Sequence, residues 1–269
     1  MNGRFWAGVA LFAVAGSAVA AGRAEGGRLL KTVGDVTIER NGTVVVGEKG
    51  AVISQGDTLR TGSDGKAQWW MQDDSLFVLP SNSALHIDEY ALPQNNSPAT
   101  GRSFMSLLKG AMRSVTGLIA HSNSSSYKIT TPVATMGVRG TDFSLVLCES
   151  DECDRTKSGA RKMGAHQVFD FPRLIKTARD VVGVRTRLFL RMDKGTGILC
   201  NSGGCTEIAA GAGASCAVAA AGEKPAPVGK CPAVFVHFDA ELDFDFDAGD
   251  IDIFRDIERI IPEPPGSPS

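Results

Sequence analysis

The sequence predicts an all-β protein with an antiparallel β-sandwich or barrel-like fold. Between residues 29 and 147, short runs rich in β-branched and aromatic residues recur at intervals of roughly 8–12 residues, separated by turn residues. Amphipathic runs of helical length are nearly absent from this stretch. The chain has 269 residues, which is enough to form one sizeable core.

Residues 1–20 have the pattern of a Sec-type signal peptide. A weakly basic start precedes an apolar stretch from Phe5 to Ala15, and Ser17 to Ala20 supply the small residues of a cleavage site. No cysteine stands at the cleavage point, so we expect a periplasmic or secreted protein of a bacterial envelope and not a lipoprotein. No later apolar run reaches the roughly 18 residues of a membrane span, so we expect none after cleavage.

Residues 29–220 are predicted to form the β-domain. Asn41-Gly42 separates two alternating runs, which is the strongest short-range signal for a β-hairpin. Gly110 separates two further short strands, at 102–110 and 111–117. Other turns are expected at 47–50, 55–57, 62–65, 72–75 and 80–83.

Six cysteines in an exported chain are typical of three disulfides. Sequential pairing is the simplest of fifteen connectivities, and each bond would close a short loop. It gives Cys148–Cys153, Cys200–Cys205 and Cys216–Cys231. A zinc site is the alternative, but zinc-binding cysteines are more often two residues apart with histidines nearby. The four histidines lie far from these cysteines in the sequence.

The sequence changes character at two places outside the regular strands. Residues 148–182 are predicted to be a surface insertion, and residues 221–269 a linker and an acidic amphipathic tail. Eleven Lys and Arg stand against three acidic residues in 155–194, whereas ten acidic residues stand against two Arg in 239–263. The two segments could therefore attract each other or stay solvated, and the net charge of −2 gives no general attraction to nucleic acid.

The tail contains a strictly alternating stretch at 236–248. Apolar residues occupy its even positions, and His237 and five acidic residues occupy the odd ones. In a strand, this period of two places every carboxylate on one face. The stretch could pack on the core as an edge element, bind a partner, or remain a disordered acidic tail.

Sequence motifs of catalysis are missing from the chain. It contains no phosphate-binding loop, no nucleophile elbow and no zinc-protease motif. None of the four histidines has an acid and a nucleophile at a recognisable spacing. We therefore expect no enzyme, no catalytic residue, no cofactor and no metal site.

Trp69 and Trp70 are adjacent in a predicted strand, so their rings should point to opposite faces of the sheet. One ring is expected in the core. The other is either covered by another part of the chain or exposed as a binding residue for a glycan or a partner loop.

Three segments resemble the FecR domain family. They are the GDTLRTG turn at 56–62, a strand that ends near Asp74, and TPVATMGVRGTDF at 131–143, which is the most specific. The resemblance covers roughly residues 33–147 and implies an all-β, non-enzymatic envelope domain. In the founding members, a cytoplasmic region contacts a sigma factor and a membrane helix follows it. Here a predicted signal peptide stands in their place, so we do not expect that regulatory role.

Arg139 lies between two glycines in the most specific of these segments. The glycines would permit a tight or bulged strand crossing. The five donors of Arg139 could bind carbonyl groups or a carboxylate such as Asp142 or Asp57 across it. We therefore expect a structural clasp, with a binding site as the alternative. The clasp would contain Gly137, Arg139, Gly140, Thr141 and Asp142.

The sequence as a whole predicts an exported FecR-like module that binds another envelope protein without catalysis. Two alternatives remain open. One is recognition of a glycan or peptidoglycan through Trp69 or Trp70. The other is a structural surface protein that assembles through an edge strand.

Overall fold

The computed structural model describes residues 25–92, 100–149, 186–211 and 213–235. The predicted signal peptide, Cys153, most of the insertion and the acidic tail lie outside these residues. Within them the all-β prediction is confirmed, because fifteen strands form one sheet. Helical residues in these ranges are limited to the short α1 (Leu118–Ser122), the 3-10 turn η2 (Ser124–Ser126), Thr100 and the pair Val234–Phe235. No helix in this part of the chain is long and apolar enough to cross a membrane.

The strands alternate with tight turns along the chain. In order, they are β1 (Glu25–Val33), β2 (Val36–Arg40), β3 (Thr43–Val46), β4 (Val52–Ser54), β5 (Thr58–Thr61), β6 (Lys66–Met71), β7 (Leu76–Leu79), β8 (Ala84–Ala91), β9 (Arg102–Val115), β10 (Tyr127–Thr130), β11 (Thr135–Cys148), β12 (Arg187–Asn201), β13 (Gly204–Ala209), β14 (Ser215–Ala220) and β15 (Glu223–Val228).

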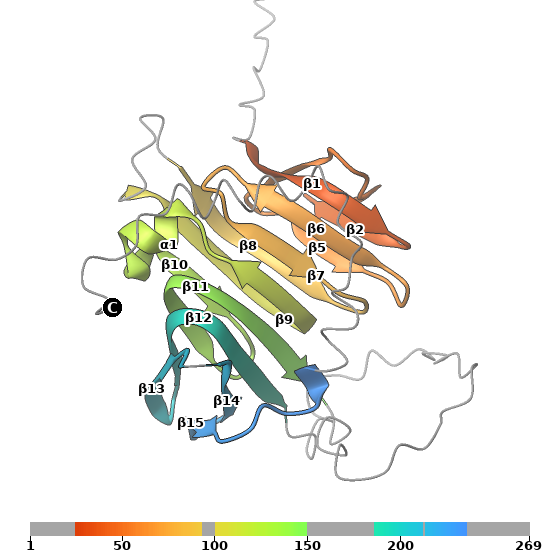
Figure 1. Cartoon of the computed structure of the whole chain (residues 1–269). Coiled ribbons are helices and arrows are strands. Elements are labelled where there is room, and N and C mark those ends of the chain that lie inside the picture. The colour runs from red at the N-terminus through yellow and green to blue at the C-terminus, as the bar shows by residue number, and fades with distance from the viewer. Residues whose placement is uncertain (1–24, 93–99, 150–185, 212, 236–269) are drawn as a thin grey trace, which may run out of the picture.

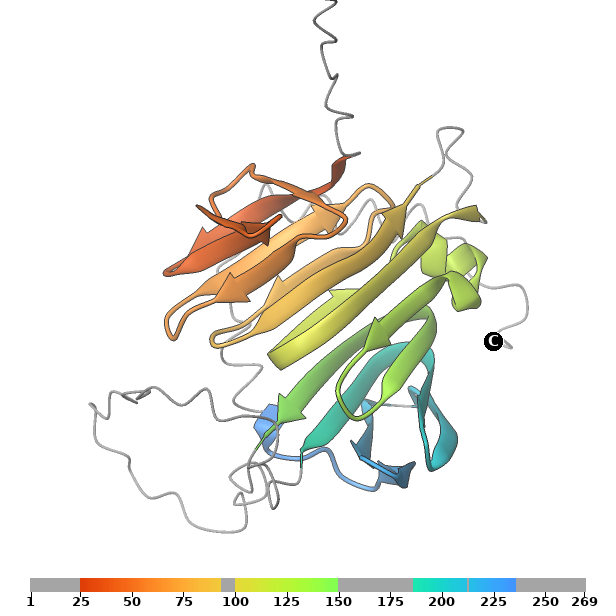
Figure 2. The same ribbon diagram turned by 180° about the vertical axis from the view of Figure 1, so that it is seen from behind.

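The sheet folds into two layers that share three long strands. Layer A runs β3, β2, β5, β8, the first half of β9, β10, the first half of β11, the second half of β12, and β13. Layer B runs β4, β1, β6, β7, the second halves of β9 and β11, the first half of β12, β14 and β15. Figure 1 and Figure 2 show the gradual passage from the red N-terminal strands at one end to the blue C-terminal strands at the other.

The arrangement is an open, sandwich-like fold and not a closed barrel. The two ends of the strand order do not pair with each other. All pairings are antiparallel except that of β9 with β10, so the sheet is mixed. The parallel pair arises because β10 enters between the diverging first halves of β9 and β11.

Each shared strand carries a glycine with positive φ at the point where it changes layer. These are Gly110 (φ 75°) in β9, Gly140 (φ 56°) in β11 and Gly195 (φ 78°) in β12. The alternation of buried side chains changes phase at the same points: Val138 and Phe143 are both buried although they are an odd number of residues apart. A left-handed residue inside a strand is typical of a β-bulge, which bends the strand and shifts its register.

Gly110 is therefore a bend and not a break. The two short strands expected on either side of it are one continuous strand, β9. The bends of β11 and β12 also lie against each other, because a Cβ on Gly195 would be 2.1 Å from the carbonyl oxygen of Gly140.

One apolar core fills the space between the layers. Within layer B, the rings of Trp69 and Phe77 stack with their centroids 5.1 Å apart. Tyr127 of layer A meets Phe143 of layer B edge to face, at 6.5 Å between centroids, and its hydroxyl lies 2.9 Å from that of Ser114 in layer B. The aromatic side chains thus join both layers into one core.

The sheet extends beyond the predicted range of 29–220. β1 begins at Glu25, and β15 lies in the stretch that the sequence assigned to a linker. The prolines of β15, Pro225 and Pro227, weaken its strand signal, but an edge strand tolerates proline because its outer N–H groups have no partner strand.

Candidate functional site

Two of the three predicted disulfides are confirmed. Cys200–Cys205 joins directly opposed residues of β12 and β13, with a Cα–Cα distance of 4.1 Å. Cys216–Cys231 ties β14 to the segment after β15, with a Cα–Cα distance of 5.2 Å. Cys148 is disulfide-bonded as well, whereas Cys153 lies outside the described residues. Oxidised cysteines fit an extracellular or periplasmic protein.

The two tryptophans lie on opposite faces of layer B. Trp69 is fully buried in the core. Trp70 is partly exposed on the outer face, and its indole N–H donates to the Asp74 carboxylate at 3.2 Å. The polar group of Trp70 is therefore already engaged within the chain.

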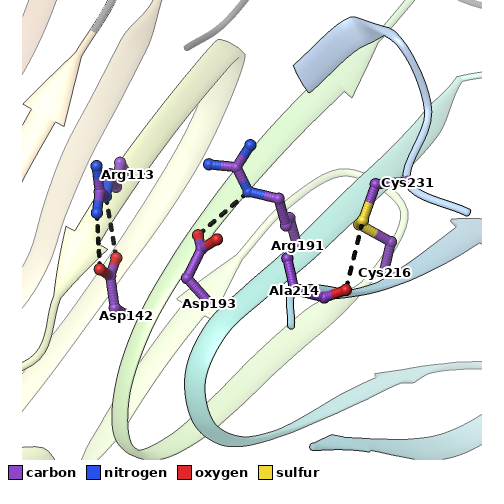
Figure 3. A network of polar contacts seen from close by, with 7 residues as sticks. All are labelled: Arg113, Asp142, Arg191, Asp193, Ala214, Cys216 and Cys231. Atoms are coloured by element: carbon purple, nitrogen blue, oxygen red, sulfur yellow. Dashed lines mark hydrogen bonds and ion pairs between the residues drawn. A yellow bond between two sulfur atoms is a disulfide. The ribbon is translucent and has the colours of Figure 1, made fainter. Parts of the chain in front are cut away.

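The carboxylates expected to bind Arg139 are held by other arginines. Asp142 accepts two hydrogen bonds from Arg113, at 3.0 Å from Nε and 2.7 Å from Nη2, as Figure 3 shows. Asp57 accepts two from Arg40, at 2.8 and 2.6 Å. The side chain of Arg139 is exposed and makes no hydrogen bond or ion pair with any residue that the structure describes.

The crossing around Gly140 is held by the end of β9 and by α1. The Thr141 N–H donates to Thr116 Oγ1 at 2.7 Å, and the Thr141 carbonyl oxygen accepts from the N–H and the hydroxyl of Thr116, at 2.9 and 3.1 Å. The ring of His121 in α1 lies against Gly140, where a Cβ would be 2.5 Å from it. Partial burial of this ring lowers the pKa of His121.

A second ion pair lies beside Arg113 and Asp142 on the outer face of layer B. Arg191 Nε donates to Asp193 at 3.1 Å, and the Arg191 guanidinium lies 5.1 Å from the ring of Phe235 (Figure 3 shows the ion pair). Burial raises the pKa of Asp193, and the nearby Arg191 opposes this shift. These contacts secure the segment after β15 to the sheet.

Asp73, expected only as a turn residue, is a buried carboxylate that links three elements. It accepts hydrogen bonds from the Ser75 hydroxyl at 2.9 Å, the Tyr90 hydroxyl at 3.2 Å and the Ile119 N–H at 3.4 Å. Burial raises the pKa of Asp73 despite these donors, and it also raises the pKa of Tyr90. The carboxylate joins the β6–β7 turn to β8 and α1, which is a structural role.

Arg139 lines a groove of about 480 Å³ on the outer face of layer A. The groove lies over β10, β11, β12 and β13 beside η2. Gly137 has no side chain, so it leaves the floor of the groove open. The side chains of Lys128, Arg139, Ile198 and Glu207 line the groove around this floor. We call this the Arg139 groove.

The chemistry of the Arg139 groove suits a polypeptide. It offers two cations, one carboxylate, an exposed isoleucine and the hydroxyls of Ser124, Ser125, Thr135 and Thr196. No group of three or more His, Cys, Asp or Glu that could hold a metal ion occurs among the described residues. Arginine and exposed apolar side chains are typical anchors of protein interfaces.

The sequence points to Arg139 and Gly137 as members of one site, but not to Lys128, Ile198 or Glu207. Lys128, Ile198 and Glu207 lie on three different strands, and only the register of β10, β11, β12 and β13 brings them together. Their sole sequence signal is that each occupies an outward position of its strand.

One comparison with known proteins gave a match. Residues 57–157 match the family model described as FecR protein. The matched range contains β5 to β11, and with them the Arg139 side of the groove, whereas β12 and β13 lie beyond it. Neither a curated protein nor a solved structure matched the chain.

Proposed function

Because this chain contains a FecR domain, of a regulatory and non-enzymatic family, we propose that it is an exported module that binds another protein of the bacterial envelope. The domain points to an envelope role related to signalling. The disulfides Cys200–Cys205 and Cys216–Cys231 support an oxidising compartment.

One observation carries the assignment of the binding site to the Arg139 groove. Arg139 stands in the segment that most resembles the family, yet its side chain makes no polar contact with any described residue. Arg113 and Arg40 bind the nearby carboxylates, so the guanidinium of Arg139 is left for a ligand. A planar group with five donors is well suited to a carboxylate or to backbone carbonyls of a partner.

The glycan alternative has less support. Trp69 is buried, and the indole N–H of Trp70 already donates to Asp74. A buried ring cannot stack on a sugar, and the Trp70 N–H would have to leave Asp74 before it could donate to one.

Site-specific photo-crosslinking in living cells tests the proposal. A photoreactive amino acid is placed at Ile198 in the groove and, as a matched control, at Leu108, since their exposed fractions are 44% and 42%. We expect a specific protein adduct from position 198 and none from position 108. Mass spectrometry then identifies the partner for a purified binding assay.

Substitution of Arg139 completes the test. In the purified assay, Arg139→Ala should weaken binding by roughly tenfold or more, because a charge-assisted hydrogen bond is lost. Its free energy of unfolding should stay within about 0.5 kcal/mol of the unsubstituted protein. Arg60→Ala, on another strand of layer A, is the control and should bind normally. Unchanged affinity of the Arg139 variant, or the lack of any adduct at position 198, would reject this site.

A further inference from the structure

β3 is an edge strand whose apolar side chains are left uncovered. Among the described strands it pairs with β2 alone, and all four of its residues are exposed. Val44, Val45 and Val46 are 62%, 44% and 70% exposed, and Val33 nearby in the sequence is 46% exposed. Four of the six large apolar side chains found exposed in the described part of the chain thus belong to β3 or to the end of β1.

The backbone of β3 also has unpaired polar groups. Arg40 and Thr43 flank a two-residue turn, and Gly47 N–H donates to Val36 O at 2.8 Å. In such a hairpin the N–H and C=O groups of alternate residues point away from the partner strand. Those of Val44 and Val46 therefore point outward, and no described residue bonds them.

The other edges of the sheet are protected. β15 carries Lys224, Pro225 and Pro227, and charged and proline residues discourage pairing with another strand. β13 is joined to β15 through the Thr206 hydroxyl, which donates to the Pro225 carbonyl at 2.6 Å. In the short β4, the Val52 carbonyl accepts from Arg40 at 2.8 Å. β3 has no charged residue, no proline and no bulge.

We propose that β3 is a dimerisation edge that pairs antiparallel with β3 of a second copy of this chain. Its central residues are all valine, so a two-fold axis places valine against valine with no like charges opposed. With Val45 on the two-fold axis, the outward N–H and C=O groups of Val44 in each copy bond those of Val46 in the other. The two A layers become one sheet that crosses the dimer.

The protected edges explain why assembly stops at two copies. An isologous contact uses the same strand on both molecules, so the free edge of each β3 is fully paired once one partner has bound. Lys224, Pro225 and Pro227 block continuation at the opposite end of the strand order. The dimer is therefore closed and does not extend into a filament.

Sedimentation equilibrium of the full chain, from about 1 to 200 μM, tests the proposal. The weight-average mass should rise from that of the monomer to that of the dimer. Val44→Pro removes an N–H that the hairpin does not use, so the fold should persist. Each dimer loses two hydrogen bonds, and its dissociation constant should rise roughly 10- to 100-fold. Val44→Thr, which retains the N–H, is the matched control and should shift it far less.

A second pair of variants keeps the test valid if the proline disturbs folding. Val44→Lys brings two lysines close together as diagonal neighbours across the two-fold axis and should abolish the dimer, whereas Ala226→Lys at the β15 edge should leave it intact. Circular dichroism confirms that each variant is folded. A chain that is monomeric at every concentration overturns the proposal, even if a different protein binds β3. A dimer that survives both Val44→Pro and Val44→Lys overturns it as well.

Discussion

Arg40 and Arg60 lie on neighbouring strands and each binds a carboxylate, but the two carboxylates differ in burial. Asp57, the partner of Arg40, is fully buried and also accepts from the Ser54 N–H at 2.8 Å. Glu39, the partner of Arg60, has a side chain that is 40% exposed. Removal of each arginine should therefore have a very different effect.

Arg40→Ala should lower the free energy of unfolding by roughly 2–3 kcal/mol, because a buried carboxylate loses its counter-charge. The value lies below that of a fully buried pair since the Arg40 side chain is 36% exposed. Arg60→Ala, the matched control, should change it by less than about 0.5 kcal/mol. Urea denaturation measures both. Equal losses in the two variants would contradict this account of the Arg40–Asp57 pair.

At the residue scale, local patterns were predictable and distant partners were not. The opposite orientation of Trp69 and Trp70 follows from the two-residue period of a strand. The partner of Asp142 does not, because Arg113 approaches only through the register in which it lies opposite Ser144. The sequence predicted Arg139 as the partner of Asp142 because the two residues are close together in the chain.

Among the elements, the bent strands β9, β11 and β12 decide the shape of the fold. Gly195 in β12 and Gly222 in the β14–β15 turn have nearly the same φ, 78° and 77°. A Cβ on Gly195 would lie 2.1 Å from the Gly140 carbonyl oxygen, whereas a Cβ on Gly222 would meet nothing within 4 Å. A comparison of alanine substitutions at Gly195 and Gly222 therefore distinguishes the cost of a left-handed backbone from the cost of a steric clash.

Gly222→Ala should lower the free energy of unfolding by about 1 kcal/mol, the cost of a left-handed alanine. Gly195→Ala should lower it by roughly 3 kcal/mol or more, because the bends of β11 and β12 must also move apart. Urea denaturation of the two variants gives the comparison. If the losses were equal, contact between the bends would not matter for stability.

Local turn chemistry was the most predictable feature at this scale. The hairpin at Asn41-Gly42 forms as expected, with positive φ at both residues, because asparagine and glycine tolerate that conformation. The prediction that Gly110 separates two short strands was wrong, because its sequence signal is the same for a turn and for a bulge within one strand. Only the pairing with β8 on one side and β11 on the other makes it a bend.

For the whole molecule, we expect layers A and B to unfold together because they share three strands. β9, β11 and β12 each contribute to both layers, and one core cluster joins them. We therefore expect a single cooperative transition in urea. Tryptophan fluorescence, to which Trp69 and Trp70 of β6 contribute, should follow the same curve as far-ultraviolet circular dichroism. Separate midpoints for the two signals would indicate that layer B unfolds independently.

The all-β class was predictable from spacing and composition, but the layer arrangement was not. Strands β1 and β6, or β5 and β8, pair across long stretches of sequence, and no local pattern specifies such partners. The same limit applies to the Arg139 groove, whose residues come from four strands and from η2. The family resemblance drew attention to Arg139, whereas the other residues of the groove could be identified only from the strand register.

The pairing of β11 with β12 has one more consequence, for how this fold can diversify. Cys148 lies opposite Arg187, so the sheet itself holds together the two ends of the chain segment between them. The entropy of closing a loop grows only with the logarithm of its length, and doubling the loop costs about 0.6 kcal/mol. Insertions of very different length can therefore be accommodated at this point. It is the natural position to graft a reporter or a new recognition module without altering the sheet beneath.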